Sequence, residues 1–447
     1  MQNEVLVEIP PRLSATSLRS VEHRLGLTLI SSQDFTLLGA RIARYRIAAS
    51  RNVASTVDAL RADGRVGGAQ PNYLFVLEQD AGTPRVAPST APPMPPVLGF
   101  DGAGQETKAA GDLSVKAEAS ANGSIAAPPE IAKPAATANV PSISEVEATI
   151  DAASSSDPLQ YAVKALHLAE AHHLATGKGI RIAVIDSGID NDSEEIKDRI
   201  VARLDTIGGE FAAHPHGTAI AGAILAHTKL VGVAPDAQVI AIRAFTGEGR
   251  SDGAQGTSFH ILQGLDFAAA QNARIVNMSF AGPRDALLAR ALLALRARSV
   301  AEIAAAGNGG PQSAPLYPGA EPGVVAVTAI DAEGKLFGLA NRGKYIAMAA
   351  PGVDILAPAP GDAVQIVSGT SIAAAHVTGI AALALERYGS LPPDALLGAL
   401  DAGARNVIPD AKREDYGAGA VDAYGVVEGK PGVANAPSAE TARAVSR

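Results

Sequence analysis

The sequence contains no cysteine and no tryptophan, and only 4% of its 447 residues are aromatic. Without cysteine there can be no disulfide scaffold, no thiolate nucleophile and no cysteine-ligated zinc. The formal net charge of −9 and the scarcity of aromatic side chains provide neither a cationic face nor a stacking surface, so no nucleic-acid partner is expected. Any chemistry must therefore come from oxygen and nitrogen groups.

Long apolar segments are also absent. The nearest candidate, residues 372–385, is shorter than the roughly 18 apolar residues of a membrane span and contains His376 and Thr378. Near the first residue, Glu4 and Glu8 stand where a signal peptide has basic and then apolar residues. We expect no membrane span, and no signal peptide is visible in this chain.

What is present divides into four regions of different composition. Residues 1–79 and 156–429 contain regular apolar patterns, and an apolar content of 47% is ample for a sizeable core. Residues 80–155 contain ten of the 29 prolines, which predicts a flexible linker, with or without a processing site. Residues 430–447 are expected to form a disordered tail.

The N-terminal region predicts a small α+β domain. Apolar residues recur at helical spacing in residues 18–25 and 53–60, which indicates two amphipathic helices. Short apolar or alternating runs predict four strands, at residues 5–7, 27–30, 43–47 and 73–77. The order β-α-β-β-α-β is the ferredoxin-like arrangement, in which both helices pack on one face of the sheet.

Residues 156–429 predict an α/β fold. Helical patterns at 259–270 and 286–297 alternate with short apolar runs. These runs lie at residues 182–185, 239–242, 275–278, 303–306 and 324–328. Apolar strands that alternate with helices are typical of a mostly parallel sheet with helices on both faces. Functional groups in such folds gather where strands end, so polar residues at those positions are candidates.

An acid and a base stand at two such positions. Asp186 ends a buried strand and is followed by Ser187 and Gly188. His216 precedes a run of small residues that predicts a tightly packed helix, whose dipole would help to keep the imidazole neutral. Taken alone, either residue could be structural, and His214 competes with His216. The other seven histidines are expected at the surface or in the core.

A serine hydroxyl and an asparagine amide are the other two candidate catalytic groups. Ser371 follows Gly369-Thr370 at the head of an alanine-rich helix, where helix-terminal N–H groups can stabilise an oxyanion. A serine helix cap would need the same residue type. Asn308 follows a short apolar run and a glycine, where its amide could donate to an oxyanion or simply form a turn.

The order Asp186, His216, Ser371 is that of the subtilisin type of catalytic triad. The chain resembles the subtilisin-like serine peptidases over nearly all of residues 157–429. Five segments occur in the family's order with similar spacing: AVIDSGID, HGTAIAGAI, NMSFAG, AAAGN and SGTSIAAAHVTG. Residues 4–78, which close with Gln-Pro-Asn-Tyr, look like a subtilisin propeptide domain.

The resemblance implies a serine endopeptidase that acts on polypeptides through an acyl-enzyme. Ser371 would attack the scissile carbonyl, His216 would carry the proton, and Asp186 would orient His216. Asn308 and the backbone N–H of Ser371 would donate to the oxyanion.

The resemblance also implies which residues bind the substrate. An edge segment would pair with an extended peptide through its backbone, and a second segment would wall the primary specificity pocket. The first consists of Ser279, Phe280, Ala281 and Gly282, and the second of Ala304, Ala305 and Ala306. Small residues in the second segment suggest a preference for a large apolar side chain before the cut.

The family's biology implies a precursor. The N-terminal domain would act as an intramolecular inhibitor and assist folding, and cleavage would fall between Glu78 and Asp157. Secretion, or export to the periplasm, is expected from the resemblance alone.

Two features qualify the resemblance. Ala375 replaces a proline that family members commonly carry, but alanine is a good helix former and no chemical group is lost. The chemistry requires no cofactor. Family members often bind calcium, yet no carboxylate spacing here assigns a site, and the acidic loop 190–195 fits a solvated surface better than a cation site.

Two other classes of protein compete with this interpretation. A non-catalytic relative with a dead site would retain the fold, although the intact Asp186, His216, Ser371 and Asn308 argue against it. A nucleotide-binding α/β protein would need a glycine-rich phosphate loop, and neither G-x-x-x-x-G-K-[ST] nor a well-placed G-x-G-x-x-G is found.

Overall fold

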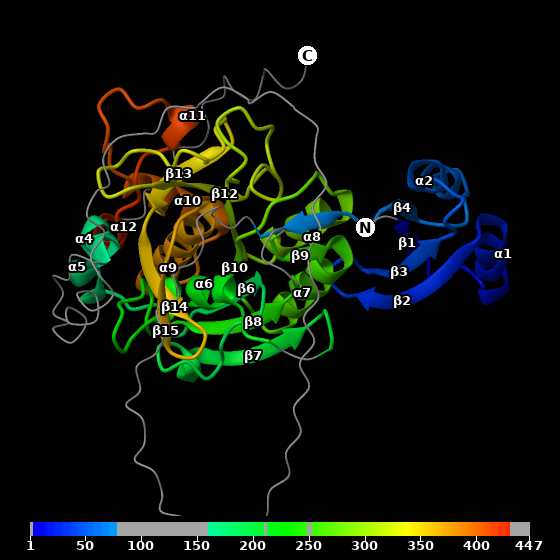
Figure 1. Cartoon of the computed structure of the whole chain (residues 1–447), viewed down its shortest axis with the longest axis horizontal. Helices are drawn as coiled ribbons and strands as arrows, with labels where there is room; N and C mark the ends of the chain where they lie inside the picture. Colours follow the sequence, from blue (N-terminus) through cyan, green and yellow to red (C-terminus); the bar gives the residue numbers. More distant parts are fainter. Residues whose placement is uncertain (1–2, 78–159, 210–211, 248–252, 430–447) are drawn as a thin grey trace, which may run out of the picture.

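A computed structural model of the chain describes residues 3–77, 160–209, 212–247 and 253–429 (Figure 1). The linker predicted at 80–155 and the tail predicted at 430–447 lie outside the described residues. Residues 4–71 form a small sheet with two helices, and together with residues 72–77 we call them the N-terminal module. Residues 160–429 form the larger main domain.

The N-terminal module has the predicted β-α-β-β-α-β order. Its elements are β1 (Glu4–Ile9), α1 (Ala15–Leu25), β2 (Leu27–Phe35), β3 (Ala40–Ile47), α2 (Val53–Arg61) and β4 (Gly68–Pro71). The sheet is antiparallel with strand order β2-β3-β1-β4. Side chains of Ser14 and Asn52 cap the two helices, and both helices pack on one face of the sheet, as predicted.

The last strand predicted for this module is the exception. Residues 73–77 do not complete its sheet, because β4 already occupies the edge beside β1. Instead β5 (Leu74–Val76) pairs in antiparallel register with β9 (Gln255–Thr257) of the main domain. An alternating apolar pattern indicates a strand but does not say which sheet the strand joins.

The main domain is built on a seven-stranded parallel sheet of order β13-β12-β11-β10-β6-β8-β7. The strands are β6 (Arg181–Asp186), β7 (Ile200–Asp205), β8 (Gln238–Arg243), β10 (Ile275–Met278), β11 (Ala301–Ala305), β12 (Val325–Ile330) and β13 (Ile346–Pro351). All five predicted apolar runs form strands of this sheet. The sequence did not reveal β7 and β13, which lie at the two edges.

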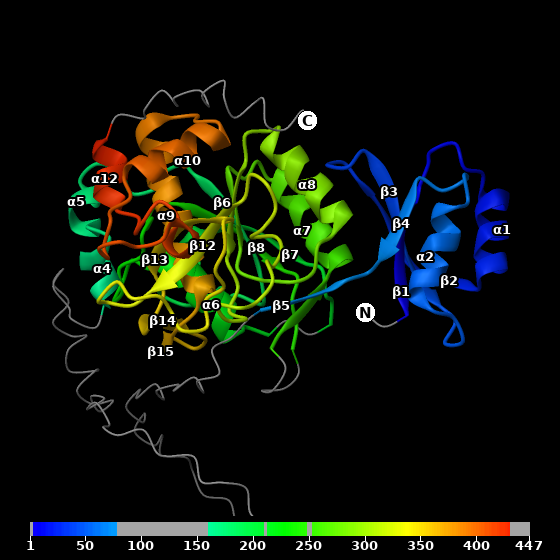
Figure 2. The same cartoon turned by 90° about the horizontal axis from the view of Figure 1, so that it is seen from above.

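Helices cover both faces of this sheet (Figures 1 and 2). On one face lie α6 (Pro215–Leu225) and α9 (Thr370–Tyr388), and on the other lie α7 (Ser258–Ala270) and α8 (Ala286–Arg296). The remaining elements are α4 (Tyr161–Ala165), α5 (Leu168–His172), a 3-10 turn (Lys197–Arg199), β14 (Ile355–Ala359), β15 (Ala363–Val367), α10 (Pro393–Ala402), α11 (Arg413–Tyr416) and α12 (Ala423–Glu428). The α/β architecture is thus confirmed, and none of the described helices meets the length and apolarity required to cross a bilayer.

The N-terminal module docks on the main domain through the sheet face that its own helices leave open. Leu6, Phe35 and Ile42 share one hydrophobic cluster with residues of α7 and α8, and Phe35 meets Phe259 edge-on with ring centroids 5.6 Å apart. Figure 2 shows α7 and α8 on the side of the main domain that faces the module. The second face of the small sheet is therefore buried only against the main domain.

Candidate active site

The acid and the base predicted from the sequence are in contact. Asp186, the last residue of β6, is completely buried, and its Oδ1 lies 2.7 Å from Nδ1 of His216 in the first turn of α6. Buried carboxylates require hydrogen-bond donors. The chain places the carboxylate at the carboxyl end of a parallel strand and the imidazole at the start of a helix that packs beside that strand.

Ser187 ties these two elements together. Its backbone N–H and its hydroxyl donate to Oδ1 of Asp186 at 2.7 and 3.0 Å, and its Oγ accepts the N–H of Gly217 at 3.1 Å. A Cβ at position 217 would lie 3.0 Å from the Ser187 carbonyl oxygen, so glycine permits the close approach. We assigned no role to Ser187 from the sequence, although its place directly after the acid was a signal.

His214 and His216 make different hydrogen bonds. It is the N-cap of α6, and its Nδ1 accepts the backbone N–H of His216 at 3.2 Å. Burial lowers the pKa of His214, and the neighbouring His216 lowers it further. Of the two histidines, His216 is the one that hydrogen bonds to the carboxylate of Asp186.

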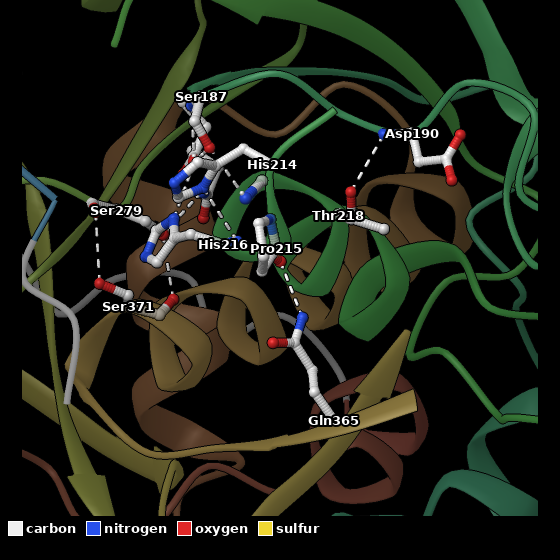
Figure 3. Close-up of polar contacts among 12 residues, drawn as sticks. Ser187, Asp190, His214, Pro215, His216, Thr218, Ser279, Gln365 and Ser371 are labelled. Atoms are coloured by element: carbon white, nitrogen blue, oxygen red, sulfur yellow. Dashed lines mark hydrogen bonds and ion pairs between the residues drawn. The ribbon is translucent and has the colours of Figure 1, made fainter. Parts of the chain in front are cut away.

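Ser371 is the second residue of α9, and its hydroxyl points toward the edge segment. The N-cap of α9 is Gly369, so Ser371 is not a helix cap. Its Oγ donates to the carbonyl of Ser279 at 3.2 Å, and the Ser279 hydroxyl donates to the carbonyl of Ser371 at 3.0 Å. Nε2 of His216 is buried and has no hydrogen-bond partner among the described residues. Figure 3 shows His216 and Ser371 together at this end of α6 and α9.

A buried polar network holds the edge segment against α9. The side-chain Nδ2 of Asn277 donates to the Ser279 hydroxyl at 3.0 Å, and the Thr378 hydroxyl donates to the side-chain Oδ1 of Asn277 at 2.9 Å. All three side chains are buried and satisfied by one another, which stabilises a single arrangement. Ala375 is a buried residue of the unbroken helix α9, so the absence of proline there leaves the helix regular.

Asn308 lies beside the start of α9. Thr370 donates to Oδ1 of Asn308 from its backbone N–H at 3.0 Å and from its hydroxyl at 2.8 Å. These two bonds set the orientation of the amide and direct Nδ2 to the other side. Gly369 has a φ of +150°, and a Cβ there would lie 3.0 Å from Nδ2 of Asn308. Glycine at this position therefore leaves room for the amide group.

The edge segment predicted to bind a peptide is paired with residues of this chain. Val76 of β5 and Ala281 exchange backbone hydrogen bonds of 2.9 and 3.0 Å, and Leu77 donates to Ala254 at 2.9 Å. Phe75 is completely buried and meets Phe280 edge-on at 5.8 Å. Thus β5 lies as a middle strand between β9 and the edge segment.

The remaining predicted substrate residues are Gly282 and three alanines in and after β11. Gly282 exchanges backbone hydrogen bonds with Tyr317 at 2.8 and 3.0 Å. Ala304 and Ala305 belong to β11, and Ala306, whose carbonyl accepts the Tyr345 hydroxyl at 2.9 Å, follows it. All three alanines are buried, and their part in a specificity pocket stays a prediction.

The acidic loop 190–195 differs from the solvated surface expected. Glu195 is only 7% exposed and accepts backbone N–H groups of Thr228 and Lys229 at 3.0 and 2.8 Å, while Asp190 accepts the N–H of Gly361 at 2.7 Å. Carboxylates used in this way anchor loops. Within the described ranges, no group of three or more such side chains could hold a metal ion.

Comparison with known proteins agrees with this geometry. Residues 177–420, more than half of the chain, match the model of the Subtilase family. The chain belongs to the subtilase family. The resemblance inferred from the five sequence segments is thereby confirmed, and the fold is that of a subtilase.

Individual subtilases are moderately similar. A thermostable alkaline protease of Halalkalibacterium halodurans is 32% identical over 53% of this chain and 65% of its own length. The major intracellular serine protease of Bacillus subtilis is 34% identical over 46% of this chain and 68% of its own length. Fervidolysin of Fervidobacterium pennivorans, a keratinolytic enzyme related to subtilisin, superposes with a TM-score of 0.70 and 18% identity over 97% of this chain. The chain spans 62% of the fervidolysin chain, and this likeness shows the fold.

Proposed function

We propose that this subtilase is a serine endopeptidase that hydrolyses peptide bonds through an acyl-enzyme. The observation that carries the proposal is the 2.7 Å contact between Asp186 and His216, with the buried Nε2 of His216 left without a partner among the described residues. A buried imidazole held by a carboxylate on one nitrogen is prepared to accept a proton on the other. A rotation of the Ser371 side chain turns its hydroxyl from Ser279 toward that nitrogen.

The reaction then proceeds in two halves. Ser371 Oγ bonds to the substrate carbonyl carbon as its proton passes to His216 Nε2, and the oxyanion accepts N–H groups from Ser371 and Asn308. The C–N bond breaks as His216 returns the proton to the leaving amine. Water, deprotonated by His216, attacks the acyl carbon, and His216 returns the proton to Ser371 Oγ as the C–O bond breaks and the acid product is released. Asp186 stabilises the imidazolium in both halves, and no metal or cofactor is needed for these steps.

We infer that the N-terminal module inhibits the enzyme in a precursor. A polypeptide substrate that pairs with Ala281 must take the place that β5 occupies, because each backbone group pairs only once on that side. The apolar module face that packs on α7 and α8 also offers a template during folding of the parallel sheet. Cleavage between Glu78 and Asp157 would release this inhibition.

The compartment is a separate proposal. We infer secretion or export to the periplasm from the family resemblance, and one relative is named as an intracellular protease. Fractionation of cells that produce the full chain distinguishes the two: activity in the medium or periplasm supports export, and activity confined to the cytoplasm contradicts it.

Substitution of Ser371 by alanine tests the mechanism. Ser371→Ala should abolish hydrolysis of peptide substrates, prevent labelling by a fluorophosphonate and leave the purified chain uncut in mass spectrometry. Ser390→Ala is the matched control, because the Ser390 hydroxyl accepts a hydrogen bond from Arg274 at an exposed position. Normal turnover by Ser371→Ala would remove the mechanism, and an unlabelled wild-type protein would favour the dead-site alternative.

Removal of residues 1–78 tests the folding role. The yield of active enzyme should fall, because the main domain then folds without the apolar face that covers α7 and α8. An unchanged yield would refute this role. Mass spectrometry of the incubated wild-type chain reports the processing position and the side chain preferred before the cut, where we expect a large apolar residue.

A further inference from the structure

His260 lies where the N-terminal module meets the main domain. It is in the first turn of α7, with Thr257 as the N-cap, and its Nε2 faces Nη1 of Arg44 in β3 at 3.4 Å. From the sequence we expected such a histidine at the surface or in the core. The structure places it at the contact between α7 and the N-terminal module.

The Arg44 guanidinium is held rigidly against this histidine. Its Nε and Nη2 donate to the two carboxylate oxygens of Glu4 in β1, at 2.8 and 3.1 Å, and both side chains are largely buried. The side chain of Asn72 connects the pair to the main domain. Its Nδ2 donates to Glu4, and its Oδ1 accepts the backbone N–H of Phe259 in α7. A guanidinium fixed in this way cannot move aside from a second positive charge.

The docked arrangement requires a neutral His260. A guanidinium only donates hydrogen bonds, so Nε2 must act as the acceptor and the ring proton must lie on Nδ1. That Nδ1 is buried and has no hydrogen-bond partner among the described residues. Burial, and then the charge of Arg44, lower the pKa of His260 to about 4 against the weaker opposing effects of Glu4 and Asp205. The start of α7 disfavours the imidazolium as well.

We propose that His260 is an acid-sensitive latch, in which protonation of the imidazole weakens the docking of the N-terminal module on α7. The consequence for activity rests on the proposed inhibitory function of the module, but docking itself can be measured without it. The charged groups that act on the ring are Arg44 and Glu4 of the module and Asp205 at the end of β7, and Asp205 is paired with Arg243 at 2.9 Å.

The direction of the effect follows from linkage. The pKa of His260 is lower in the docked state, so docking is strongest above the ordinary value of 6.5 and weakens as the pH falls toward about 4. If undocking restores the ordinary value, docking is about thirty-fold weaker at about pH 5 than at neutral pH. Glu4 and Arg44 belong to the same module, so their ion pair persists on undocking and does not reverse this trend.

Hydrogen exchange of the full chain carrying Ser371→Ala tests the latch, because this variant cannot process itself. The amides to follow are those protected at the docking contacts, Val76, Phe259 and Ala281. After correction for intrinsic rates, their exchange should be about thirty-fold faster at about pH 5 than at about pH 7.5. In His260→Gln, which remains polar and neutral, this acceleration should disappear. His173→Gln, at an exposed position, is the matched control and should keep it.

A second variant keeps the test decisive if His260→Gln disturbs the interface. In Arg44→Gln the charge of the guanidinium is removed but the burial of the ring remains, so acid should accelerate exchange at these amides less than in the parent. Equal acceleration in the parent and His260→Gln would overturn the latch, as would no acceleration in the parent. Neither outcome bears on the catalytic proposal, which Ser371→Ala tests separately by loss of hydrolysis.

Discussion

The faces of the two sheets of this protein are covered by different parts of the chain. The parallel sheet of the main domain is covered on both faces by helices of the same domain. The antiparallel sheet of the N-terminal module covers one face with α1 and α2, and its other face is buried only by α7 and α8 of the main domain. Both faces of the main-domain sheet are thus covered by helices of that domain, whereas one face of the module sheet is covered by α7 and α8. The candidate active site lies in the main domain, and β5 pairs with the edge segment beside it.

The polar groups of the two regions follow the same division. In the site, one carboxylate oxygen of Asp186 receives three donors, all from the main domain. At the docking surface, Gln70 of the module donates to Asp285 at 2.8 Å and accepts the N–H of Leu287 at 3.1 Å. Contacts of the first kind lie within the main domain, and contacts of the second kind join the module to it.

Loss of the base should have the largest effect. His216→Ala removes the proton acceptor for Ser371, and we expect kcat to fall at least about 10⁴-fold, a scale for triad members known from subtilisin. His214→Asn should keep most of the activity, because asparagine can also cap α6. Equal losses in the two variants, measured with a peptide substrate after removal of the module, would contradict the assignment of roles.

An intermediate effect is expected at the docking contact of β5. Phe75→Ala removes a completely buried ring that packs on Phe280, a loss of about 3 kcal/mol or roughly 100-fold in docking. Exchange of the Ala281 amide in the Ser371→Ala chain should accelerate accordingly, while the β11 amides remain protected. Leu29→Ala, at a position 51% exposed, is the control. An unchanged Ala281 rate would show that the module is not held through this strand.

The smallest effect is expected at Ser187. Ser187→Ala removes one hydroxyl donor to Asp186 and the acceptor for the Gly217 N–H, and we expect roughly a ten-fold loss in kcat with little change in KM. Ser187→Thr should restore kcat. A loss of stability with kcat unchanged would indicate a purely structural role.

Much of this arrangement was predictable from local pattern. The five apolar runs formed parallel strands because strands buried on both faces must be apolar throughout. The edge strands β7 and β13 were missed, and β7 shows the reason: its residues alternate between half-buried and exposed. Glu195 was expected in solvent, but it is buried because loop N–H groups far along the chain bind its carboxylate.

The sequence could predict which residues form the candidate site, but it could not predict the hydrogen bonds that these residues make. Asp186 and His216 meet because the carboxyl end of β6 and the start of α6 lie on the same edge of the sheet. The rotamer of Ser371, the bridging hydroxyl of Ser187 and the amide orientation of Asn308 depend on neighbours more than 25 residues away. Such contacts leave no periodic signal in a sequence.

The sequence by itself determined the fold class, the family and the residues that meet at the end of β6, because hydrophobic periodicity and short motifs are local properties of the chain. Only the tertiary structure decided where β5 pairs and that His260 faces Arg44 at the contact between α7 and the N-terminal module. These features depend on which surfaces meet after each part has folded, and complementarity between distant surfaces is a property of three-dimensional packing.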